Sequence, residues 1–184
     1  LDVSLEESTI CPNAKSAILY EGKTDSLLYE QEMNLRLPPA SMTKIMTMLL
    51  VMESIEKGII KWDDMVTVSS NASGMGGSQI LLETGEQMSV YDMFKGLAVA
   101  SGNDAAVALA EHVGHDLNGF ADLMNAKVSD LGLTSTHFVT PHGLDNDEHF
   151  TTAYELAIIT DYALQNNIFR KIVGTKNYTV SING

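Results

Sequence analysis

The most informative segment of the chain reads Pro38-Pro39-Ala40-Ser41-Met42-Thr43-Lys44. Two prolines end the preceding structure, and the apolar run that follows predicts a helix over residues 41–57, closed by Gly58. Apolar side chains lie almost all round this helix, so we expect it to be buried. A serine and a lysine three residues apart share a helix face, and the amine of Lys44 can therefore reach the hydroxyl of Ser41.

This pair has the chemistry of an activated nucleophile. The helix dipole and the apolar neighbours both disfavour a cation in the first turn, which lowers the pKa of Lys44. A neutral lysine can accept the Ser41 proton as a general base, and backbone N–H groups of the same turn would face the oxyanion formed on attack. Taken alone, the pair also fits a helix-capping serine beside a lysine that reaches water.

The composition limits the class of protein. With 184 residues, 45% of them hydrophobic, the chain can build the core of a domain. It carries 24 acidic and 11 basic residues, a formal charge of −13, and no basic cluster, which argues against a nucleic-acid partner. No apolar run has the length of a membrane span. The single cysteine, Cys11, can form no internal disulfide.

Periodicity and turn residues predict the other elements. Strands at 15–20 and 26–31 would form an N-terminal hairpin, and a short strand at 66–69 would precede a mobile loop of small residues at 70–78. Capping residues and apolar spacing predict helices over 89–99, 103–113, 118–131 and 152–165.

The end of the chain carries an incomplete pattern. Residues 176–182 alternate as a strand, and the following Asn183-Gly184 is typical of a hairpin turn. Because a hairpin needs a returning strand, we expect the natural chain to continue beyond Gly184.

A second motif, Ser101-Gly102-Asn103-Asp104, lies between two predicted helices. On its own it is a helix cap. Sixty residues after the first motif, it completes the serine-x-x-lysine plus serine-x-asparagine arrangement of penicillin-recognising serine enzymes. From Asn13 onward the chain resembles the low-molecular-mass penicillin-binding proteins, the serine-type D-alanyl-D-alanine carboxypeptidases. The segments that carry the resemblance are Pro38–Met46, Gly76–Ile80, Ser101–Glu111, Thr140–Leu144, His149 and Thr151–Ala153.

The resemblance implies an α/β fold of the β-lactamase and DD-peptidase type, a helical region plus an antiparallel sheet that is incomplete in this chain. Residues 1–12 would be an N-terminal arm, and 13–184 the N-terminal part of the catalytic domain. The family's third motif, lysine, threonine or serine, then glycine, is missing. Lys23-Thr24-Asp25 lies in the predicted hairpin turn, and Gly174-Thr175-Lys176 has the reverse order. We expect the third-motif strands, the C-terminal domain and an amphipathic membrane anchor to lie beyond this chain.

The resemblance also implies a role for each motif residue. Ser41 would attack the carbonyl of the penultimate D-alanine and Lys44 would be its base. Ser101 would relay a proton to the leaving amine, and Asn103 would hydrogen-bond the substrate amide, so that Ser41, Ser101 and Asn103 also bind substrate. The loop at 73–78 would lie at the cleft edge.

No cofactor is required for this chemistry. The implied partners are the peptidoglycan stem peptide and β-lactam antibiotics, which stall at the acyl-enzyme. The implied location is the bacterial cell surface or periplasm, with membrane association only through the expected anchor.

Three alternatives remain open on the sequence. A β-lactamase with this second motif uses a Glu-x-x-x-Asn segment, but the matching position before Asn118 is Gly114. A metal site could use His112 with His115, although no HExxH pattern accompanies them and both histidines also fit a helix end. The chain could instead be a catalytically incomplete fragment or a non-catalytic penicillin-recognising domain, whose free sheet edge would favour dimerisation. A second cluster of histidines and acidic residues fits either a metal site or a group that shapes a loop. It comprises His142, Asp145, Asp147 and His149.

Overall fold

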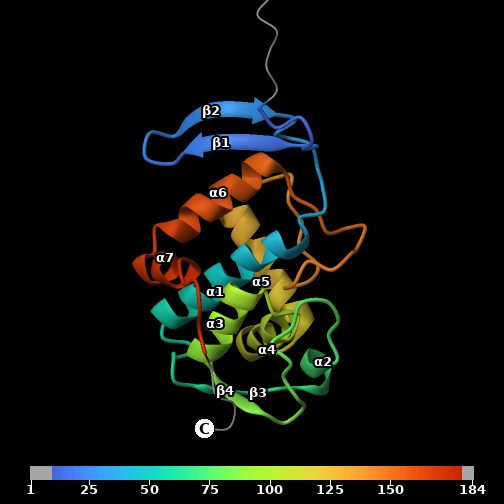
Figure 1. Cartoon of the computed structure of the whole chain (residues 1–184), viewed down its shortest axis with the longest axis vertical. Helices are drawn as coiled ribbons and strands as arrows, with labels where there is room; N and C mark the ends of the chain where they lie inside the picture. The colour runs from blue at the N-terminus through green and yellow to red at the C-terminus, as the bar shows by residue number, and fades with distance from the viewer. Residues whose placement is uncertain (1–9, 180–184) are drawn as a thin grey trace, which may run out of the picture.

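The computed structural model describes residues 10–179, a helical body with a pair of strands at each of two ends (Figure 1). The longer helices are α1 (Lys44–Glu56), α3 (Val90–Ala100), α4 (Asn103–Gly114), α5 (Leu117–Asp130), α6 (Ala153–Leu164) and α7 (Asn167–Val173). The shorter elements are the 3-10 turn η1 (Ala40–Thr43), the one-turn helix α2 (Ser70–Ser73) and the strands β1 (Ala17–Glu21), β2 (Ser26–Gln31), β3 (Met65–Thr67) and β4 (Gln87–Ser89). The strands β1 and β2 pair antiparallel, as do β3 and β4.

The predicted N-terminal hairpin is confirmed. Strands β1 and β2 pair from Ala17 opposite Gln31 to Glu21 opposite Ser26, with a shift of register between Leu19 and Tyr20. Thr24, in the connecting turn, donates its backbone N–H to the carboxylate of Glu21 at 2.7 Å. The Lys-Thr pair at this position therefore belongs to a turn, as expected.

The helix α1 is the centre of the molecule, with α3, α4, α5, α6 and α7 packed around it (Figure 1). Every side chain from Met46 to Ser54 is buried, which confirms the prediction of a core helix. The α-helix begins at Lys44, later than predicted, because residues 40–43 form the tighter turn η1. In a 3-10 turn the side chains at i and i+3 eclipse each other, so this start aligns Ser41 with Lys44 more closely than an α-helical turn would.

Local capping explains the boundaries of the other helices. Ser89 accepts the N–H of Asp92 at the start of α3, and Thr152 accepts the N–H of Glu155 at the start of α6, as the capping boxes predict. The small-residue segment 70–78 is only partly a loop, because its first four residues form the helix α2. The side chain of Ser69 caps this helix by accepting the backbone N–H of Ala72.

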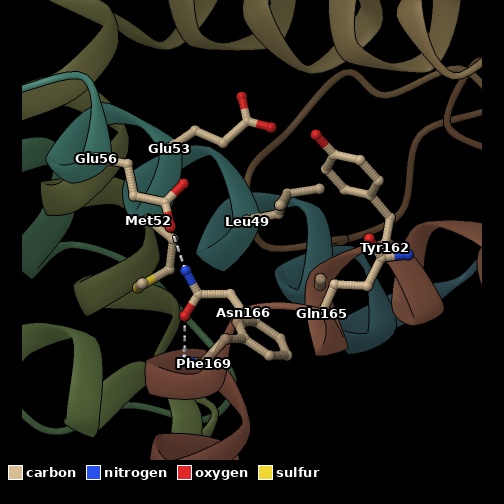
Figure 2. A pocket seen from close by; sticks show the side chains of 9 residues that line it. Leu49, Met52, Glu53, Glu56, Tyr162, Gln165, Asn166 and Phe169 are labelled. Carbon is tan, nitrogen blue, oxygen red and sulfur yellow. Dashed lines mark hydrogen bonds between the residues drawn. The ribbon is translucent and has the colours of Figure 1, made fainter.

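Besides α2, the strand β4 and the helix α7 were not predicted. Both elements are short, and each is held by contacts with another segment of the chain, β4 by pairing with β3 and α7 through its capping residue. Asn166 caps α7 through the N–H groups of Ile168 and Phe169 and also donates its side-chain amide to Glu56 on α1 (Figure 2). The second of these contacts joins residues distant in sequence, so the sequence pattern gave little sign of it.

The C-terminal strand prediction is wrong where it can be checked. Residues 176–179 form no strand, while 180–182 and the Asn183-Gly184 turn lie outside the described residues. Side-chain contacts hold this segment against α3 instead. The Tyr178 hydroxyl donates to Asp92 at 2.6 Å, and the Lys95 ammonium lies 4.8 Å from the Tyr178 ring centre. In the part of the chain that is described, no helix is long and apolar enough to cross a membrane.

Candidate active site

Three functional groups meet at the start of α1. The ammonium Nζ of Lys44 lies 2.9 Å from Ser41 Oγ and 3.1 Å from Ser101 Oγ. Lys44 is only 3% exposed, whereas Ser41 is exposed. The arrangement therefore places a reachable hydroxyl in front of a buried amine, with a second hydroxyl on the other side of that amine.

Unusual backbone conformations position both serines. Ser101 ends α3 in the left-handed conformation, with φ +57°, and Ala40 precedes Ser41 with φ +49°. Left-handed backbone at non-glycine residues costs free energy and persists only where the surroundings enforce it. Strain at both serine-bearing turns is therefore a feature of this site.

Burial changes the acid–base behaviour of Lys44. Desolvation lowers its pKa from 10.5 to about 8, and the nearby Asp104 carboxylate opposes this shift. At pH 7 about one lysine in ten would then be neutral. The prediction of a depressed pKa is confirmed in direction, and burial is its main cause.

Asn103 ties the second motif to the loop that follows α2. Its side-chain amide donates to the carbonyl of Gly76 at 2.6 Å, and its backbone N–H donates to the carbonyl of Ser78 at 2.7 Å. The loop at 73–78 therefore packs directly against Asn103.

Asp104 is a structural residue that sequence reasoning treated only as a helix start. It is 1% exposed, and its carboxylate accepts the backbone N–H groups of Ile80, Leu82 and Ala105 at 2.9–3.1 Å. One carboxylate thus anchors the loop to the first turn of α4. The sign of this anchoring role in the sequence is an acidic residue directly after the serine-x-asparagine motif.

The second histidine cluster does not assemble as a unit. His142 and His149 are buried, whereas Asp145 and Asp147 are exposed. Among residues 10–179, no group of three or more histidine, cysteine or acidic side chains is placed to hold a metal ion. Buried His149 instead contacts Thr43 at 2.7 Å, within the first motif.

His112 and His115 lie at the C-terminal end of α4. His112 is in the last turn, and His115 ends the helix with φ +67°. These are the helix-closing positions that the sequence suggested.

Comparison with known proteins identifies the family. The family model for D-alanyl-D-alanine carboxypeptidase, peptidase S11, matches residues 4–183. The chain belongs to this family. The D-alanyl-D-alanine carboxypeptidase DacF of Bacillus subtilis is 49% identical over 168 residues, which cover 91% of this chain and 43% of that relative. The chain thus spans less than half the length of this relative.

Solved structures place the chain in the DD-peptidase fold of this carboxypeptidase family. Penicillin binding protein 5 from Haemophilus influenzae is 36% identical, with a TM-score of 0.87 over 91% of this chain and 50% of that chain. A serine-to-alanine mutant of the Streptomyces K15 DD-transpeptidase is 30% identical, with a TM-score of 0.86 over 92% of this chain and 68% of that chain. The predicted family and fold class are confirmed.

Proposed function

We propose that this chain carries the nucleophile and base of a serine D-alanyl-D-alanine carboxypeptidase that removes the terminal D-alanine from peptidoglycan stem peptides. The observation that supports this most strongly is the buried Lys44 amine, within hydrogen-bond distance of both Ser41 and Ser101. A lysine with a pKa of about 8 serves as a general base near neutral pH.

The reaction would proceed through an ester on Ser41. As Ser41 Oγ attacks the carbonyl carbon of the penultimate D-alanine, its proton passes to Lys44 Nζ. The tetrahedral intermediate then collapses, the C–N bond breaks, and the leaving amine takes a proton through the Ser101 hydroxyl. Asn103 would hold the substrate amide. Water hydrolyses the ester and regenerates Ser41.

A β-lactam would enter the same pathway and stop part-way. Attack on its ring carbonyl also forms an ester on Ser41, but the leaving nitrogen stays tethered to the acyl group. β-Lactams would therefore inhibit the enzyme, and the covalent adduct supplies a direct assay.

Intact mass spectrometry after incubation with benzylpenicillin tests the assignment. We expect one added penicillin in the chain, none in Ser41→Ala, and an undiminished adduct in Ser129→Ala, which removes an exposed serine from α5. A folded chain that gains no adduct would instead support a catalytically incomplete fragment or a non-catalytic domain. Rapid turnover of a chromogenic cephalosporin would favour a β-lactamase.

The stem-peptide substrate implies a place outside the cytoplasmic membrane. Catalysis would need no cofactor, since the two hydroxyls and the amine carry the proton transfers and the Asn103 amide holds the substrate. Dimerisation through a free strand edge is a further expectation, which sedimentation velocity of the chain at two concentrations would test.

A further inference from the structure

The turn that carries the nucleophile has two functional faces. Ser41 and Lys44 face Ser101, as described above. Ala40, Thr43 and Thr47 are spaced by three and four residues, so they form a second stripe along the same turn and the start of α1. This second stripe contacts residues 140–149, a segment outside the two sequence motifs.

Three contacts join the second stripe to residues 140–149. The Thr43 hydroxyl lies 2.7 Å from His149 Nε2, and the Thr47 hydroxyl donates to the carbonyl of Pro141 at 2.6 Å. Gly143 packs against the carbonyl of Ala40 with no room for a side chain. Thr43 and Thr47 are fully buried and His149 is 2% exposed, so water does not compete for these hydrogen bonds.

The surroundings fix the tautomer of His149. The backbone N–H of Val139 donates to its Nδ1 at 2.9 Å, which requires a lone pair on that nitrogen. In the neutral ring the proton must then be on Nε2, and Nε2–H donates to Thr43 Oγ1. Burial lowers the pKa of His149 from 6.5 to about 4, with a further contribution from His137, so the ring is neutral at physiological pH.

We propose that His149 is a positioning residue, which holds Thr43 through its Nε2–H and thereby fixes the turn that aligns Ser41 with Lys44. The left-handed backbone of Ala40 needs such support, because a strained turn relaxes unless its neighbours hold it. The proposal rests on the proposed function for its catalytic consequence, but its structural part can be measured without any activity.

Rates of acylation by benzylpenicillin test the catalytic consequence. Thr43→Val keeps the shape and removes the hydroxyl, and we expect acylation about tenfold slower, since small misplacements of a nucleophile are costly. Thr43→Ser keeps the hydroxyl and should stay near the rate of the unmodified chain. Thr160→Val removes a hydroxyl that donates within α6, to the carbonyl of Leu156, and serves as the matched control.

Variants at His149 complete a double-mutant cycle. His149→Ala should slow acylation by a similar factor, His149→Gln should recover part of it by supplying an N–H donor, and combining His149→Ala with Thr43→Val should add little further loss. Multiplicative losses, or a wild-type rate in folded Thr43→Val, would overturn the proposal. If His149→Ala does not fold, the Thr43 variants decide.

Two spectroscopic measurements do not depend on acylation. Nitrogen-15 NMR should show His149 as the neutral Nε2–H tautomer between pH 5.5 and 8, and Nδ1–H or a charged ring would overturn the proposal. The pKa of Lys44, followed by NMR of its ε-carbon, should rise in Thr43→Val toward the ordinary 10.5 as the turn loosens, and an unchanged value would also overturn it. If the unmodified chain is never acylated, the proposed function fails while these measurements still judge the role of His149.

Discussion

Gly143 packs directly against the carbonyl oxygen of Ala40, and a Cβ atom at Gly143 would overlap that oxygen. Gly143 also has φ +84°, a conformation that glycine adopts freely. The residue before the nucleophile is thus held by a backbone-to-backbone contact that only glycine permits. This contact links two segments about a hundred residues apart in the chain.

Replacing Gly143 with alanine should destabilise the fold by about 2–4 kcal/mol, because overlap adds to the cost of a left-handed backbone. Urea unfolding measures the change. Gly58→Ala is the matched control, since Gly58 has φ +69° with open space around it, and we expect a cost there of only about 1 kcal/mol. Equal losses at the two glycines would show that the contact with Ala40 is unimportant.

The rate of acylation by benzylpenicillin should rise about tenfold between pH 7 and pH 9, because Lys44 loses its proton around pH 8. Stopped-flow or quenched mass spectrometry over this range gives the profile. Lys44→Arg should nearly abolish acylation, since a guanidinium keeps its proton. Lys57→Arg, at a side chain that is 63% exposed, should leave the profile unchanged. A rate independent of pH from 6 to 10 would rule out the neutral lysine.

Asp104→Asn should have two separate effects. It removes a charge that raises the pKa of Lys44, so the midpoint of the pH–rate profile should move to lower pH. It also weakens the anchor for three backbone N–H groups, two of them buried and that of Ile80 half-buried, at a cost of about 2–3 kcal/mol.

Asp116→Asn is the matched control for this change. Asp116 is exposed and caps α5 through one N–H group, so its replacement should cost less than about 1 kcal/mol. A midpoint that stays fixed or rises in Asp104→Asn would contradict the electrostatic role.

Acidification should destabilise the fold through two buried histidines. Burial lowers the pKa of both His142 and His149 from 6.5 to about 4, with the charge of Lys44 contributing at His142. Between these values the unfolded chain binds protons that the folded chain does not, so stability is full above pH 6.5 and falls toward pH 4. Each histidine accounts for a loss on the order of 3 kcal/mol at most.

Urea unfolding at pH 6.5, 5.5 and 4.5 tests this slope. His142→Gln should flatten it, because one of the two groups no longer titrates. His115→Asn, at an exposed left-handed position that asparagine tolerates, should leave the slope as it is. A slope unaffected by His142→Gln would assign the acid sensitivity to other groups.

A largely buried ion pair joins α5 to α1. The Lys127 ammonium lies 2.6 Å from one carboxylate oxygen of Glu53, and the other oxygen accepts from Lys57 at 3.2 Å. Figure 2 shows Glu53 and Tyr162 lining the adjoining pocket. Lys127→Met should cost about 3 kcal/mol, because it leaves a buried carboxylate without its main partner. Lys57→Met removes an exposed partner and should cost under about 1 kcal/mol. Thermal or urea unfolding that ranks the two variants equally would contradict this difference.

Local signals predicted most of the secondary structure. The capping residues Ser89 and Thr152 and the turn around Thr24 act within a few positions of themselves, so their effects can be read from sequence. The one-turn helix α2 and the helix α7 were missed because such short elements have little periodicity. The prediction of a strand at 176–182 is wrong over 176–179, because an alternating sequence forms a strand only where a neighbouring strand pairs with it.

The sequence by itself determined the pairing of Ser41 with Lys44, since a spacing of three residues brings two side chains together in any helical turn. Only the tertiary structure decided that Ser101 lies on the other side of the lysine amine, and that Lys44 is buried enough to lower its pKa to about 8. The support of Thr43 by His149 was also decided there. These relationships join residues 57 and 106 positions apart, and only the packing of α3, α4 and the segment 140–149 around α1 brings them within hydrogen-bond distance.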